Sequence, residues 1–308
     1  MYRPISDVTC LRVLVALLGA VLGTGGVGLA AAAAPLRVST FVVDVTPRLG
    51  QPVGLGFIAA ARTSEHPLLA KGIVLGGSGK PVVLCAIDWM EFHNDAFAML
   101  QARIAAAAAT DPSRVSLHAL HQHTAPALDP DAQMLMLGVD SPRRIASAAY
   151  LKSAADRIAA AVRAALRKSR PVTHVGTSQA KIQKMASSRR LLREDGSITA
   201  RMSSTRDAAL RALPEGRIDP WLKTVTLLSG RRPLVQLHYY ATHPQSFYGD
   251  RRLTYDVPGI VRERLQKETG VFQVYFSGCG GDVAFGKYND GTAAARDRLV
   301  ERLDRGMR

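Results

Sequence analysis

The chain lacks the motifs of several common catalytic classes. It has no G-x-S-x-G segment, which marks a serine nucleophile on a sharp strand-to-helix turn. Its glycine-rich segment SGCGGDVAFG (277–286) lacks the lysine and the spacing of a phosphate-binding P-loop. Only three cysteines occur in 308 residues, and Cys279 has no activating partner near it in the sequence. A water molecule activated by a metal ion is the nucleophile that these absences favour.

Aromatic residues are scarce, at 6%, although the chain carries 40 basic and 25 acidic side chains, a formal net charge of +15. The basic residues are scattered, with few aromatic residues between them, so no nucleic-acid partner is indicated. An exported protein with a net positive charge more often binds anionic polymers or lipid headgroups. We therefore expect peripheral contact with an anionic membrane surface. The 47% of apolar and 21% of charged residues are typical of a globular protein.

Residues 1–34 differ from the rest of the chain. Arg3 and Arg12 flank the start of an apolar stretch that ends in small residues, the pattern of a cleaved signal peptide. The sequence therefore predicts a secreted or periplasmic protein. A retained membrane anchor is the alternative, because the stretch approaches the roughly 20 residues that a membrane span requires. No small-residue lipobox precedes Cys10, which argues against a lipoprotein.

Short apolar strands alternate with Ala- and Arg-rich helical stretches along residues 35–308, with no visible internal repeat. This alternation predicts the α/β class, with a mixed β-sheet core and helices packed on the outside of a single domain. The strands are expected at 80–88, 114–120, 172–182, 222–228, 233–240 and 271–278, and the helices at 95–109, 143–168 and 257–268.

Four polar segments each follow directly on an expected strand, namely Asp88, His121, His243 and the GCGGD turn at 278–282. In α/β sheets ligands collect outside the carboxyl ends of the strands, so we expect these segments to converge on one site. The glycine turn favours either anion binding through its N–H groups or a close approach of backbone to the site, and both interpretations stay open.

Three of the eight histidines fall within six residues, in LHALHQHTAPALDP (117–130). His121 and His123 point to the same side if the segment is extended, and His243 follows its strand as His121 does. Catalytic zinc is usually held by three protein ligands, which leave one position open for water. His118 and His238 lie within strands and are expected to pack or form hydrogen bonds. Structural or surface positions are expected for His66, His93 and His174.

In order along the chain, these segments resemble the catalytic domain of the neutral/alkaline (non-lysosomal) ceramidase family. FVVDVTPRLGQPVGLGF (41–57) is similar to the opening of that family, and HQHTAPA resembles its motif His-Thr-His-(Ser/Thr)-Gly-Pro. YYATHPQS resembles the second histidine motif, and FSGCGGDV resembles the Gly-Asp turn. The resemblance implies a zinc-dependent amidohydrolase that cleaves the N-acyl bond of ceramide-like lipids or related amphiphiles.

The resemblance also implies roles for individual residues. His121 and His243 match the two zinc-binding histidines, and His123 matches a histidine that hydrogen-bonds the substrate. In SSRR (187–190), Arg189 matches an arginine of the family that reaches the same site, with Arg190 as the alternative.

The sequence departs from the family in length. The remaining zinc ligands of the family, a glutamate and a tyrosine, come well after the Gly-Asp turn, whereas 26 residues (308 minus 282) follow Asp282 here. Residues 35–308 are therefore expected to form an incomplete catalytic domain, or Asp88, Asp256 or Asp282 to complete the zinc shell. An inactive envelope protein with this fold, or a hydrolase of a different amide, are the alternatives.

Overall fold

Two five-stranded mixed sheets form the centre of the computed structural model, which describes residues 2–4, 34–56, 58–139, 145 and 147–308. Their strand orders are β7-β5-β4-β2-β9 and β1-β10-β14-β15-β17, and every neighbouring pair is antiparallel except β5–β7 and β15–β17. The strands are β1 (Tyr2–Pro4), β2 (Arg37–Asp44), β4 (Leu69–Gly76), β5 (Val82–Ile87), β7 (Val115–Ala119), β9 (Arg170–Pro171), β10 (His174–Lys181), β14 (Trp221–Ser229), β15 (Arg232–Tyr240) and β17 (Phe272–Ser277).

The two sheets repeat one topology along the chain. When short elements are set aside, an antiparallel hairpin in each half, β4–β5 or β14–β15, is followed by a long helix, a parallel strand and a second long helix. These helices are α1 (Asn94–Ala108) and α3 (Ala148–Leu166) in the first half, and α5 (Asp256–Thr269) and α6 (Ala293–Met307) in the second. No repeat was visible in the sequence, because a topology is fixed by the pattern of buried positions and not by residue identity.

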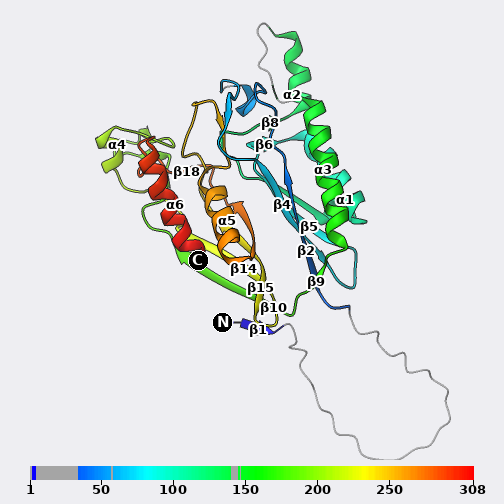
Figure 1. Cartoon of the computed structure of the whole chain (residues 1–308). Helices are drawn as coiled ribbons and strands as arrows, with labels where there is room; N and C mark the ends of the chain where they lie inside the picture. Colours follow the sequence, from blue (N-terminus) through cyan, green and yellow to red (C-terminus); the bar gives the residue numbers. More distant parts are fainter. Residues whose placement is uncertain (1, 5–33, 57, 140–144, 146) are drawn as a thin grey trace, which may run out of the picture.

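Helices flank the pair of sheets on both sides. In Figure 1, α1 and α3 lie on the right against the first sheet, and α5 and α6 lie on the left with the second. Alternate residues of β5 belong to two different apolar clusters, as strand geometry requires: Cys85 packs with α1 and α3, whereas Ala86 packs with the second sheet, α5 and α6. The first sheet is therefore buried on both faces.

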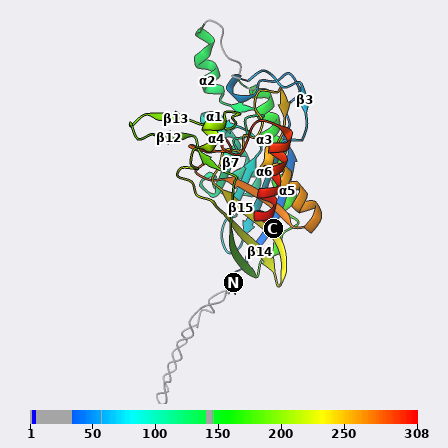
Figure 2. The same cartoon turned by 90° about the vertical axis from the view of Figure 1, so that its left-hand side faces the viewer.

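Shorter elements surround the ends of the sheets. Figure 2 shows α2 standing out at one end of the molecule and the β12–β13 hairpin projecting to one side. These elements are β3 (Thr63–Ser64), β6 (Glu91–Phe92), β8 (Ala127–Leu128), α2 (Pro130–Leu135), β11 (Ser187–Ser188), β12 (Arg190–Leu192), β13 (Ile198–Ala200), α4 (Ala208–Ala212), β16 (Arg252–Leu253) and β18 (Val283–Ala284).

The structure confirms the predicted fold class and each predicted element. The helix expected from residue 143 begins at Ala148 among the described residues, where the Ser147 hydroxyl caps it by accepting a hydrogen bond from the Tyr150 N–H. Of the expected signal peptide, residues 1 and 5–33 lie outside the described residues, and β1 pairs with β10. No helix in the part of the chain that the structure describes is long and apolar enough to cross a membrane.

A buried ion pair connects the two halves. The Arg262 guanidinium on α5 donates to both carboxylate oxygens of Asp88, at 2.9 and 2.8 Å, and neither side chain is exposed to solvent. Asp88 directly follows β5, and its carboxylate also accepts the backbone N–H of Leu69. The bidentate geometry and the extra donor compensate both charges, which is the condition under which a buried pair is tolerated.

Arg262→Met should destabilise the protein by about 3–5 kcal/mol, because it leaves the buried Asp88 carboxylate without a counter-charge. Denaturant unfolding would measure the change in the free energy of unfolding. Arg264→Met is the matched control on the same helix: this side chain is 42% exposed and lies 3.8 Å from Asp304. The control should cost less than about 1 kcal/mol. Equal losses in both variants would contradict a special role for the Asp88 pair.

His238 is a buried structural residue of β15, as its position within the strand predicted. Its Nδ1 lies 2.8 Å from the Thr224 hydroxyl, and its Nε2 lies 2.7 Å from Oε1 of Gln273. Because Oε1 only accepts, Nε2 carries a proton. Burial lowers the pKa of His238 to about 4.

His238→Gln should weaken the dependence of folding stability on pH between about 6.5 and 4. In that window the unfolded imidazole binds a proton and the folded one does not, so stability is lost as the pH falls toward 4. From this residue alone the loss is on the order of 3 kcal/mol. Urea titrations across this pH range would compare the two proteins. Identical slopes would show that His238 is protonated in the folded state.

Candidate metal centre

Three histidines from two loops meet at the carboxyl ends of the parallel strand pairs. One ring nitrogen from each of His121, His123 and His243 lies within 4.8 Å of the other two. The ring centroids of His121 and His243 are 4.7 Å apart, and that of His123 lies 5.0 and 5.6 Å from them. Among the described residues, no other group of three or more His, Cys, Asp or Glu side chains meets in this way.

Backbone contacts fix His121. This residue follows β7 with a φ of 69°, a left-handed conformation that a non-glycine residue rarely adopts and that costs on the order of 1–3 kcal/mol. Its backbone N–H donates to the Trp89 carbonyl at 3.0 Å, and its Nδ1–H donates to the Met90 carbonyl at 2.8 Å. Nδ1 therefore carries a proton, and Nε2 is the atom that this contact leaves to bind a metal.

A second carbonyl holds His243 in the same way. Its Nδ1–H donates to the Gly280 carbonyl at 2.7 Å, and burial lowers its pKa, so the ring is neutral with its lone pair on Nε2. A Cβ at Gly280 would lie 2.8 Å from the backbone of Thr242, closer than such atoms approach. Glycine therefore lets the turn come close enough to hold His243, which favours close approach over anion binding as the role of this turn.

His123 faces the other two histidines without a partner of its own. Its Nε2 is buried and has no hydrogen-bond partner. Burial, reinforced by His121, His243 and Arg189, lowers the pKa of His123 to about 3, so its ring is neutral at pH 7. The exposed ring of Tyr248 lies 5.9 Å from it, a neighbour that the sequence analysis did not single out.

Arg189 lies at the site and Arg190 does not. Nη1 of Arg189 is 3.5 Å from Nε2 of His243 and donates to the Gly281 carbonyl at 3.3 Å. Arg190 is exposed and forms an ion pair with Asp282 at 2.6 Å. The structure thus separates two arginines that the sequence left as alternatives.

None of the three carboxylates expected to complete a zinc shell belongs to the histidine group. Asp88 pairs with Arg262, and Asp282 pairs with Arg190. Asp256 is fully buried, where it accepts the backbone N–H of Ser246, and burial raises its pKa. Each has a structural partner, which a sequence without contacts could not show.

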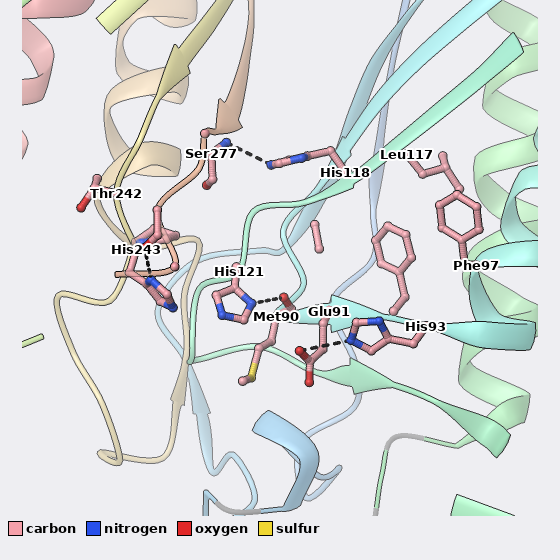
Figure 3. A pocket seen from close by; sticks show the side chains of 16 residues that line it. Met90, Glu91, His93, Phe97, Leu117, His118, His121, Thr242, His243 and Ser277 are labelled. Carbon is pink, nitrogen blue, oxygen red and sulfur yellow. Dashed lines mark hydrogen bonds and ion pairs between the residues drawn. The ribbon is translucent and has the colours of Figure 1, made fainter. Parts of the chain in front are cut away.

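A cavity of about 460 Å³ opens beside His121 and His243 (Figure 3). Much of its wall is apolar and includes Phe92, Phe97 and Leu117. His118 also lines it, but its Nε2 accepts the backbone N–H of Ser277, so this histidine supports the wall as expected. Glu91 and His93 complete the polar part of the lining; the sequence analysis had missed Glu91 and had assigned His93 to a structural or surface position.

The donor set fits a zinc ion. Neutral imidazoles with their lone pairs directed together are common zinc ligands, and a carbonyl on the other ring nitrogen is the usual support for such a ligand. Three histidine nitrogens, with a cavity beside them, match the composition of a hydrolytic zinc site that keeps one position open.

Comparisons with known proteins agree with this fold. No protein-family model matches the chain, and no curated protein matches it in sequence. Two solved structures are similar in three dimensions, each with a TM-score of 0.62 over 89% of this chain. One is a neutral ceramidase from Pseudomonas aeruginosa, at 14% identity, and the other is a ceramidase complexed with C2, at 15% identity. The chain spans 45% and 44% of their lengths, and it has the fold of that part of these ceramidases.

Proposed function

We propose that the protein is a zinc-dependent amidohydrolase that cleaves N-acyl bonds in ceramide-like lipids or related amphiphiles. The observation that carries the proposal is the convergence of His121, His123 and His243 beside a largely apolar cavity. The fold shared with two solved ceramidases supports the scaffold, and the ordered motifs of the sequence support the substrate class.

In this proposal His121, His243 and His123 hold the zinc ion. Carbonyls occupy the Nδ1–H groups of the first two, which leaves Nε2 of each for the metal, and at His243 the metal would replace the contact with Nη1 of Arg189. His123 becomes the third ligand, in place of the hydrogen-bonding role that the resemblance implied, because its buried Nε2 has no other partner. A bound zinc ion lowers the pKa of a coordinated water toward about 7 and polarises a carbonyl group.

The remaining residues of the site would bind and polarise the substrate. The apolar wall of the cavity accepts a hydrocarbon chain and excludes water from it. The Arg189 guanidinium stabilises the negative charge that develops on the carbonyl oxygen during attack, since it is fixed by Gly281 at the edge of the histidine group.

We also propose an extracytoplasmic location and contact with anionic membranes, on the basis of the N-terminal apolar stretch and the net charge of +15.

His121→Ala and His243→Ala should each weaken zinc binding by more than about 100-fold, the upper end of the loss seen when only the support of a ligand is removed. His123→Ala should weaken it as well. Isothermal titration calorimetry with chelator-treated protein would give the affinities. His118→Ala is the matched control, because His118 lines the same cavity and is engaged by Ser277. Unchanged affinity in the His121 and His243 variants would rule out this metal site.

Arg189→Met should lower kcat for a fluorogenic N-acyl-sphingosine by about 10²–10³-fold, the cost of removing one donor to a developing oxyanion. Arg190→Met should leave kcat unchanged, because Arg190 is exposed and forms an ion pair with Asp282 instead of contacting the histidines. Activity should also be lost with a chelator and restored by zinc. Activity that survives the chelator would contradict the zinc mechanism, and zinc binding without hydrolysis of any N-acyl amide would favour a non-catalytic protein.

A further inference from the structure

Glu91 is held against the histidine loop by main-chain contacts. It begins β6, which pairs in parallel with β8, the strand directly after the histidine motif. The preceding residue, Met90, donates its N–H to the Pro126 carbonyl at 2.9 Å and accepts the Nδ1–H of His121 at 2.8 Å. The backbone that supports His121 therefore also fixes the position of Glu91.

Only one of the two oxygens of the Glu91 carboxylate has a polar partner. Its Oε2 lies 3.3 Å from Nε2 of His93, whereas its Oε1 is buried and has no hydrogen-bond partner. The Glu91 side chain is 17% exposed and that of His93 is 53% exposed. Leaving a buried acceptor unpaired costs about 1–3 kcal/mol, more for a charged group, so this oxygen calls for a functional explanation.

Glu91 shares the cavity with two of the proposed metal ligands. Figure 3 shows Glu91 beside Met90, with His121 on one side and His93 on the other, and all of them line the cavity. A substrate or water molecule in this cavity would thus meet the histidines and the carboxylate together.

Hydrolysis of an amide needs a group that moves a proton from the attacking water to the departing nitrogen. The histidine group is occupied by the proposed metal, and the guanidinium of Arg189 only donates, because it stays protonated in proteins. Among the described residues that line the cavity, Glu91 is the only carboxylate, and a carboxylate can both take up and release a proton.

We propose that Glu91 is the proton-transferring catalytic residue and that His93 is a positioning residue, which orients its carboxylate. The Glu91 carboxylate takes a proton from water as the water oxygen bonds to the carbonyl carbon. Glu91 then gives that proton to the amide nitrogen as the C–N bond breaks, which yields a carboxylic acid, an amine and the original carboxylate. This inference rests on the proposed amidohydrolase function.

The test compares Glu91→Gln with the wild type in zinc-loaded, full-length protein. With a fluorogenic N-acyl-sphingosine, kcat should fall by about 10²–10⁴-fold, the usual contribution of a general acid–base residue. KM and bound zinc should not change. With a nitroanilide of the same acyl group the loss should be smaller, because this amine departs with little need for a proton.

Three further variants separate chemistry from folding. Glu194→Gln makes the same change at an exposed position between β12 and β13 and should behave as the wild type. Glu91→Asp keeps the carboxylate and should recover part of the lost kcat, while His93→Gln should lower kcat less than Glu91→Gln. Wild-type kcat in Glu91→Gln, or loss of zinc from it, would overturn the proton-transfer role alone. An inactive wild type would overturn the proposed function and this role together.

Discussion

The arrangement of the site depends on the buried contact between Asp88 and Arg262. Asp88 directly follows β5 and is followed by Trp89 and Met90, and the carbonyls of those two residues hold His121. Arg262 belongs to α5, which follows the loop that carries His243. The ion pair therefore fixes the supports of one histidine relative to the half of the chain that provides another. A buried ion pair contributes little net stability, so its value here is that it defines one arrangement of the halves, a role documented for some buried polar groups.

Main-chain carbonyls rather than side chains orient His121 and His243. A carbonyl is fixed by the fold and cannot change rotamer, so the Nε2 atoms of His121 and His243 keep their directions before any ligand binds. Holding the rings in this way constrains the backbone. His121 must adopt a left-handed conformation, and Gly280 must lack a side chain. Strain of this kind persists only where surrounding contacts determine it, and in this loop those contacts are two hydrogen bonds to residues after β5.

The sequence predicted the elements and the principal histidines because both leave local signals. Short apolar runs marked β5 and β15, and the positions of His121 and His243 after their strands marked the site. The carboxylates could not be assigned, since whether Asp88 faces a metal or Arg262 depends on a partner 174 residues away. Glu91 was missed for a similar reason. Its two-residue strand has no periodicity of its own, and its place in the cavity follows from pairing with β8.

The repeated topology explains why the centre lies between the halves. In the first half the histidine follows β7 and the supporting carbonyl, that of Met90, follows β5, its parallel neighbour. In the second half the order is exchanged, since His243 follows β15 and its carbonyl, that of Gly280, follows the neighbouring β17. Each parallel pair thus supplies one ligand and its own support at its carboxyl end. Neither half alone brings together more than two of the three imidazoles, so the metal affinity we expect is a property of how the halves pack.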